Sequence, residues 1–193
     1  MMTGKKTTKP SPRERILEAA EELFYREGIR GVGVEAIAAR AETTKMALYR
    51  HFESKDALVA EWLRLMAAQD EAVFDRLESE HPGDPRAQLL GWAQVIAGRL
   101  SEGYRGCPLI NSLAELPDKN HPARQVIEAH KARHARKLAA LCTLAGIPEP
   151  EAAASEILFV LEGAQVSAQC MGAAKVGERL MRIVKAIVDG KGG

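Results

Sequence analysis

Apolar positions recur every three or four residues along most of the chain, which is the spacing of a helix with one buried face. No segment shows a sustained alternation of apolar and polar residues, so no strand is predicted. The first helix is the most sharply marked. Ser11 and Glu14 form a capping box around Pro12, and Gly28 stands where a C-terminal cap belongs. The pattern therefore predicts an all-α protein.

Prolines, glycines and capping residues divide the rest of the chain into further helices, about nine in all. After the first helix they are predicted at residues 34–41, 45–52, 54–79, 85–102, 109–116, 122–145, 151–171 and 175–188. The residues before Ser11 are polar and basic, with no apolar face to join a core. We therefore expect a flexible basic arm at residues 1–10, a three-helix unit at 11–57 and a larger helical domain at 58–190.

Composition narrows the class of protein. Charged residues make up 27% and hydrophobic residues 46% of the 193, as in ordinary globular proteins, and the formal net charge is only +1. The longest strongly apolar run, residues 157–161, is far too short to span a membrane, and the basic N-terminus does not resemble a signal peptide. Three widely spaced cysteines suggest no disulfide framework and no zinc ribbon. We expect a cytoplasmic protein with no membrane partner.

Residues 31–55 carry the strongest functional signal. Two helices of about eight residues, separated by a three-residue turn, have the layout of a helix-turn-helix, whose second helix enters the major groove of DNA. Ile37, Ala38 and Leu48 would hold the two helices together. The outward side chains combine hydroxyls, cations and an aromatic ring, which suit base edges and phosphates. The residues predicted to bind DNA are Thr43, Thr44, Lys45, Met46, Tyr49, Arg50 and His51, with Lys55 in the first turn of the next helix.

Residues 13–62 resemble the N-terminal domain of the TetR family of bacterial transcriptional regulators. The resemblance rests on Ile16-Leu17-Glu18-Ala19-Ala20, Val34-Glu35-Ala36-Ile37-Ala38, Thr44-Lys45-Met46-Ala47-Leu48-Tyr49-Arg50-His51-Phe52 and Ser54-Lys55-Asp56-Ala57-Leu58. It implies a helix-turn-helix DNA-binding domain at 11–57, a recognition helix at 45–52, and a ligand-binding and dimerisation domain at 58–190. By position it implies that Thr44, Lys45, Tyr49 and His51 contact DNA and that Lys55 binds a phosphate. The expected function is that of a homodimeric repressor, released from a palindromic operator of double-stranded DNA by a small apolar or amphipathic inducer.

Two positions depart from the family pattern. The family usually has glycine in the turn where this chain has Glu42, and often serine or threonine where it has Gly33. If Glu42 is left-handed, its side chain costs on the order of 1 kcal/mol, and its charge would lie near DNA. Gly33 can cap a helix but offers no side chain to a phosphate. Both changes are expected to weaken DNA binding without altering the fold.

The larger domain offers candidates for a ligand pocket and a dimer interface. Its apolar residues and a few polar ones fit a cavity between helices. The predicted pocket residues are Trp62, Met66, Trp92, Ile96, Leu100, Cys107, Asn111, Leu113, Phe159 and Gln165. The last two helices have more apolar positions than one internal face needs, which favours a two-fold interface over an entirely buried pair of helices. The predicted interface residues are Leu158, Leu161, Gln165, Ala168, Leu180, Val184 and Ile187.

A second class of function depends on Cys107. It precedes a helix, where free N–H groups favour a thiolate, so it could be a redox sensor or, with a histidine, the nucleophile of an enzyme. No glycine-rich phosphate loop or nucleophile elbow accompanies it, so we expect no enzyme and no cofactor. His130 and His134 are spaced to share a metal ion, but their neighbours are basic. We interpret them as part of a solvated basic face and expect no metal site.

Overall fold

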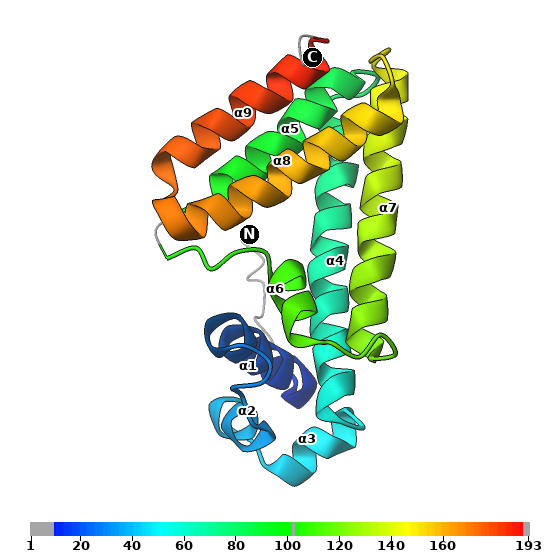
Figure 1. Ribbon diagram of the computed structural model, residues 1–193. Helices are drawn as coiled ribbons and strands as arrows, with labels where there is room; N and C mark the ends of the chain where they lie inside the picture. The colour runs from blue at the N-terminus through cyan, green and yellow to red at the C-terminus, as the bar shows by residue number, and fades with distance from the viewer. Residues whose placement is uncertain (1–9, 102, 191–193) are drawn as a thin grey trace, which may run out of the picture.

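The computed structural model describes residues 10–101 and 103–190, which fold into nine α-helices and no strand (Figure 1). The all-α prediction is confirmed for these residues, while almost all of the predicted arm at 1–10 lies outside them. The helices are α1 (Pro12–Glu27), α2 (Val34–Arg40), α3 (Lys45–His51), α4 (Lys55–Glu80), α5 (Pro85–Arg99), α6 (Pro108–Glu115), α7 (Pro122–Leu144), α8 (Pro150–Met171) and α9 (Ala174–Val188).

The local signals at the helix ends act as predicted. The Ser11 hydroxyl accepts a hydrogen bond from the backbone N–H of Glu14, and the Glu14 carboxylate accepts one from the N–H of Ser11, which completes the capping box. Thr44 caps α3 by accepting from the N–H of Ala47 at 3.1 Å. The main difference is in α5, which ends at Arg99 and not near residue 102, since the chain turns there to bury Leu100.

Two hydrophobic clusters form the interior. One joins α1, α2 and α3 to the first half of α4 and the start of α7, around Ile16, Ile37 and Leu58. The other, around Trp92, lies between α5, α8, α9 and the far parts of α4 and α7. Figure 1 shows α4 and α7 running side by side past both regions. The helix α4 thus crosses the predicted domain boundary at residue 57 without interruption and contributes to both clusters. From here on, α1–α3 are called the head and α5–α9 the body.

The head and the body are also joined through the loop between α1 and α2. The Glu115 carboxylate at the end of α6 accepts hydrogen bonds from the backbone N–H groups of Ile29 at 3.1 Å and Arg30 at 2.9 Å. Gly28 makes this approach possible, because it has φ +80° and a β-carbon there would meet both Glu115 oxygens at 3.0 Å. The loop between α5 and α6 adds a second link, in which Arg105 N–H donates to the Tyr25 hydroxyl.

None of the nine described helices has a stretch long and apolar enough to cross a membrane.

Candidate functional site

The helix α3 presents most of its surface to solvent at the tip of the head. Leu48 is fully buried against α1 and α2 and holds the helix in place. Met46 is 69% exposed and Tyr49 is 43% exposed, although both are large and partly apolar. All the predicted contact residues on α3, together with Thr44, are exposed, and Thr43 is half-buried. The result is a projecting surface of mixed hydroxyl, cationic and apolar groups, with the dimensions of one short helix, which suits a major groove.

The two lysines predicted to contact DNA, Lys45 and Lys55, already have partners within the chain. The Lys45 ammonium donates to the Glu35 carboxylate at 2.6 Å on the exposed surface of the head. This bond raises the pKa of Lys45 and lowers the pKa of Glu35. The Lys55 ammonium is turned inward, where it donates to the Ile29 carbonyl and lies over the Phe24 ring. Exposed pairs such as Lys45 and Glu35 exchange readily, whereas Lys55 also supports the loop between α1 and α2.

The two departures from the family pattern have clear structural consequences. Glu42 has φ +51°, so the left-handed conformation considered for this position is present with a side chain that disfavours it. Its carboxylate is exposed in the turn before α3. Gly33 caps α2 with an extended backbone and without a side-chain hydrogen bond. Neither position disturbs the packing of α2 against α3.

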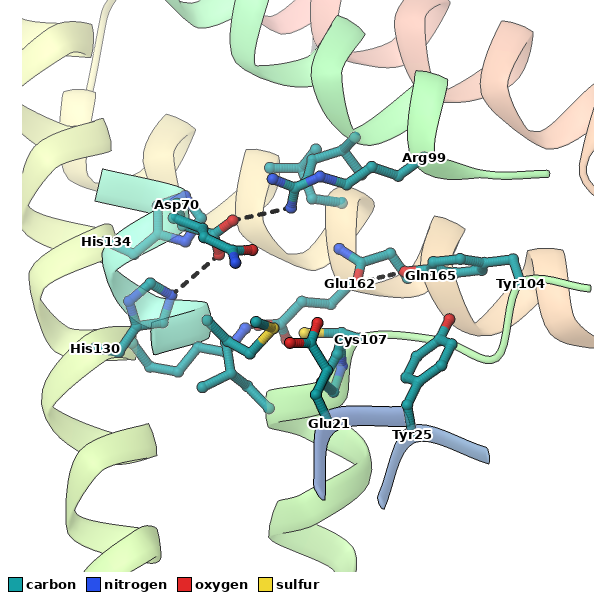
Figure 2. A pocket seen from close by; sticks show the side chains of 18 of the residues that line it. Glu21, Tyr25, Asp70, Arg99, Tyr104, Cys107, His130, His134, Glu162 and Gln165 are labelled. Carbon is teal, nitrogen blue, oxygen red and sulfur yellow. Dashed lines mark hydrogen bonds and ion pairs between the residues drawn. The ribbon is translucent and has the colours of Figure 1, made fainter. Parts of the chain in front are cut away.

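A partly enclosed cavity of about 790 Å³ lies between the head and the body. Its walls come from α1, α4, α5, α7 and α8, from the start of α6 and from the loop that leads into it. Trp62 and Trp92 provide apolar wall, and the hydroxyl of Tyr104 donates to the Gln165 side chain at 3.1 Å. Figure 2 shows Glu21 and Tyr25 rising from α1 toward this space, across from Arg99. The first helix of the head is therefore part of the cavity wall.

The polar side of the cavity is organised around Asp70. Its carboxylate bonds to the Arg99 guanidinium at 2.9 Å and lies 3.4 Å from the His130 ring nitrogen Nε2 (Figure 2). Burial disfavours the charge, but the His130 and Arg99 contacts outweigh it and hold the pKa of Asp70 below its ordinary value. Burial, with the charges of Lys131 and His130, lowers the pKa of His134 to about 4. His134 is therefore neutral at pH 7.

The thiol of Cys107 lines the same cavity at the N-terminus of α6. Burial raises the pKa of Cys107, and this effect exceeds the opposing influence of Lys131 and of the backbone N–H groups of Ile110 and Leu109. Burial therefore works against the thiolate that the helix N-terminus was expected to favour, and redox sensing at Cys107 stays an untested alternative.

Comparison with known proteins identifies the architecture. A family model described as bacterial regulatory proteins of the tetR family matches residues 16–62. A solved TetR transcriptional regulator from Streptomyces avermitilis is 31% identical, and the match covers 94% of this chain and 98% of that chain with a TM-score of 0.81. The chain belongs to the TetR family. TetR-family proteins are DNA-binding transcriptional regulators and not enzymes, which excludes the alternative of a cysteine-dependent enzyme.

Other TetR-family relatives extend over most of the chain. The structure of SCO4454, a TetR-family transcriptional regulator from Streptomyces coelicolor, has a TM-score of 0.89 and 28% identity, covering 94% of this chain and 96% of that chain. The HTH-type transcriptional regulator YjdC of Escherichia coli is 26% identical over 152 residues, which cover 78% of this chain and 80% of that protein. The likeness therefore includes the body as well as the head.

The structure brings six of the predicted pocket residues together around the cavity and places four elsewhere. Those that line it are Trp62, Met66, Trp92, Ile96, Cys107 and Gln165. Leu100 is buried in the body cluster, Leu113 packs against the head cluster, and Asn111 donates to the Arg105 carbonyl. Phe159 is 73% exposed, because it lies on a different face of α8 from Leu158 and Leu161, which do line the cavity. The pocket prediction is wrong for these four.

Several cavity residues were not anticipated from the sequence. They include the α1 residues Glu18, Glu21 and Tyr25, and also Asp70 and Tyr104. His130 and His134 were interpreted as a solvated basic face, but they are buried and line the cavity, so that interpretation is wrong. Of their basic neighbours in the sequence, Lys131 also lines the cavity, whereas Arg133, Arg136 and Lys137 do not. No cluster of three or more metal-binding side chains occurs among the described residues.

The predicted dimer interface also needs correction. One of its residues, Leu158, is half-buried and lines the cavity. The others are buried within the chain, where a second subunit could not reach them. Leu161 and Gln165 line the cavity, and the rest pack in the body cluster: Ala168, Leu180, Val184 and Ile187. The excess of apolar positions in α8 and α9 is largely explained by these internal contacts. What the two helices leave exposed is a different set, with Phe159, Val166, Met171 and Ile183 as its large apolar members.

Proposed function

We propose that this TetR-family protein is a homodimeric repressor that binds a palindromic operator through α3. A small apolar or amphipathic molecule in the cavity favours a conformation that has a low affinity for the operator, so the protein dissociates from the DNA. In this proposal residues 11–57 form the DNA-binding domain, and residues 58–190 bind the ligand and the second subunit.

The observation that carries the proposal is the exposure of α3. The buried Leu48 anchors this helix in the head, while Met46 and Tyr49 are exposed. Burying their apolar surface against DNA would be favourable. The proposed DNA contacts are Thr43, Thr44, Lys45, Met46, Tyr49, Arg50 and His51. Lys45 would exchange the Glu35 carboxylate for a phosphate, and Lys55 has N–H donors besides the one given to Ile29.

The proposed dimer contact is the exposed stripe of α8. Phe159, Gly163, Val166 and Cys170 recur at the spacing of one helical face, and all four are exposed. The small residues allow two copies of α8 to approach closely, and Ile183 of α9 extends the apolar surface. A second copy of the same chain covers such a stripe with a matching one when the symmetry is two-fold. Two heads placed by that axis would read two half-sites of a palindrome.

The proposed control by a ligand follows from the position of the cavity. Its wall includes α1 of the head and α8 of the body, so an occupant touches both. A ligand that prefers one relative position of head and body shifts the population toward that position only by its difference in affinity for the two states. Glu115 and Arg105 connect the same two parts and would move with them.

Selection of bound sequences from a random DNA pool tests the function directly. We expect an enriched palindrome, and the purified protein should bind it far more tightly than a scrambled duplex at about 150 mM salt. Equal affinity for the two duplexes would contradict the proposal. Sedimentation of the free protein and of Phe159→Arg tests the dimer, because a buried arginine at the interface would weaken association.

A further inference from the structure

The cavity has an imbalance of charge that indicates what kind of ligand it takes. The fixed cations on its wall, Arg99 and Lys131, are both engaged by carboxylates, Arg99 with Asp70 at 2.9 Å and Lys131 with Glu162 at 2.7 Å. An anionic ligand would have to displace one of these carboxylates. The wall therefore offers no free positive charge to a carboxylate or phosphate.

Two of the three α1 carboxylates on the cavity wall are in the opposite situation, whereas the third, Glu22, is paired with Arg40 and Arg26. Glu18 and Glu21 line the cavity, and neither forms an ion pair with any other described residue. Both side chains are exposed to solvent. Partial desolvation by the surrounding residues, and then the negative charge of Glu18, raise the pKa of Glu21. A neutral ligand that covered these groups would remove water from them without replacing it. A positive charge beside them would compensate for the lost water and reduce their mutual repulsion.

The remainder of the wall suits an aromatic or apolar body with a few polar atoms. Trp62, Trp92, His130 and His134 are all at least nine-tenths buried. Each has one ring nitrogen without a hydrogen-bond partner among the described residues, and all four residues line this cavity. Four unpaired buried nitrogens beside one cavity are unusual in a folded protein. Since neighbouring atoms cover them in this conformation, a ring must turn before an occupant can bond to its nitrogen. Indole rings are also the best aromatic partners of organic cations.

We propose that the ligand of this cavity is a lipophilic organic cation whose charged group lies against Glu18 and Glu21 of α1 and whose apolar body lies against Trp62 and Trp92. The proposal rests on the regulated DNA binding proposed above, for which this cavity is the ligand site. The formal net charge of the whole chain is +1, so the preference for a cation arises from the local arrangement and not from the overall field. Because both carboxylates belong to the head, the bound charge acts directly on the element that carries α3.

Two ions of nearly the same shape and opposite charge test the proposal. Tetraphenylphosphonium is a permanent cation, and tetraphenylborate is its anionic counterpart. The chain has two tryptophans, Trp62 and Trp92, and both line the cavity, so intrinsic fluorescence of the full-length protein reports binding. We expect the cation to bind on the order of tenfold more tightly than the anion, or better.

Charge-removing variants locate the preference. The double variant Glu18→Gln and Glu21→Gln should reduce the cation-to-anion ratio by about tenfold. Glu27→Gln removes one charge from the same helix, at an exposed position that does not line the cavity, and should leave the ratio unchanged. Circular dichroism checks that each variant is folded.

The outcomes separate this inference from the proposed function. Equal binding of the two ions, tighter binding of the anion, no binding of either, or an unchanged preference in the double variant would each overturn the assignment of a cation. Binding of the selected duplex is measured on the same protein by fluorescence anisotropy. If the duplex is bound and the ions are not distinguished, the ligand class alone is wrong. If no duplex is bound, the proposed function fails whatever the ions do.

Discussion

The head and the body of this regulator use the same element, the amphipathic helix, in different ways. In the head, α2 and α3 are short, adjacent in the chain and held by a few buried residues such as Ile37 and Leu48, so their function lies on the outside. In the body, long helices bury their apolar faces against one another and leave a cavity between them, so the function lies inside. The comparison shows that the outer site depends on neighbours in the sequence, whereas the inner site depends on how distant segments meet.

The largest effect is expected on the outer site. Replacing Lys45 and Tyr49 together by alanine should weaken binding of the selected duplex by about a hundredfold, because a phosphate partner and a large groove contact are lost together. The fold should not change, since both side chains are exposed. Fluorescence anisotropy with labelled duplex measures the affinity. Lys119→Ala, an exposed lysine of the body, is the matched control. Unchanged affinity in the double variant would show that α3 does not read the DNA.

The outer site was predictable because its signals are local. The Ser11 capping box, the cap at Thr44 and the buried Leu48 all act within a few residues of the position where they were identified. The bounds of α2 and α3 differ from the predicted ones by only one residue at the end of each helix. The position of Glu42 in the turn also indicates a left-handed conformation, and its φ is +51°. Local chemistry and helix periodicity are sufficient to describe this part.

The inner site could be predicted only in part. Apolar residues such as Trp62 and Trp92 were correctly grouped, because large apolar side chains collect in the interior wherever they occur. The carboxylate of Glu21 was missed, because no spacing in the sequence relates α1 to α8. The prediction of a solvated basic face at His130 and His134 is wrong, because their basic neighbours do not decide which residues of α7 are buried. Which apolar residues of α8 face outward depends on packing within the chain, and the pattern alone does not decide it.

The next largest effect concerns the stability of the inner site in acid. The pKa of His134 is lowered from 6.5 to about 4, because burial and the neighbouring charges of Lys131 and His130 disfavour its protonation. Between these two pH values His134 is protonated in the unfolded chain and neutral in the folded chain. The contribution of His134 to the free energy of unfolding is therefore fully present above about pH 6.5 and is lost as the pH falls toward about 4. We expect a loss of about 2.5 kcal/mol between about pH 7 and about pH 4.5, measured by urea unfolding at constant protein concentration.

Substitution separates His134 from other titrating groups. His134→Phe keeps a ring against Phe74 and Trp92 and should remove most of this loss. His51→Gln changes an exposed histidine of the head and should leave the pH dependence as it is. The same acid profile in His134→Phe as in the unmodified protein would mean that another group causes the loss.

A smaller effect is expected where the two regions meet. Glu115→Ala removes the acceptor for the backbone N–H groups of Ile29 and Arg30, so the loop between α1 and α2 loses its attachment to α6. The expected cost is about 1–2 kcal/mol of the free energy of unfolding, since the part-buried N–H of Ile29 and the exposed N–H of Arg30 both lose a charged acceptor. Hydrogen exchange should accelerate at these two amides more than in α8. Glu78→Ala, on the exposed side of α4, should change neither. Slow exchange at both amides in Glu115→Ala would show that the contact does not hold the loop.

The smallest effect concerns Glu42, which combines a backbone cost with a charge near the proposed DNA surface. Glu42→Gly should stabilise the protein by about 1 kcal/mol, because glycine adopts φ +51° without strain. Glu42→Gln removes the charge but keeps the β-carbon, so it should leave stability nearly unchanged. Both variants should bind the selected duplex a few times more tightly, since both remove a negative charge. If only Glu42→Gly tightened binding, the geometry of the turn and not its charge would be what limits the affinity of the head.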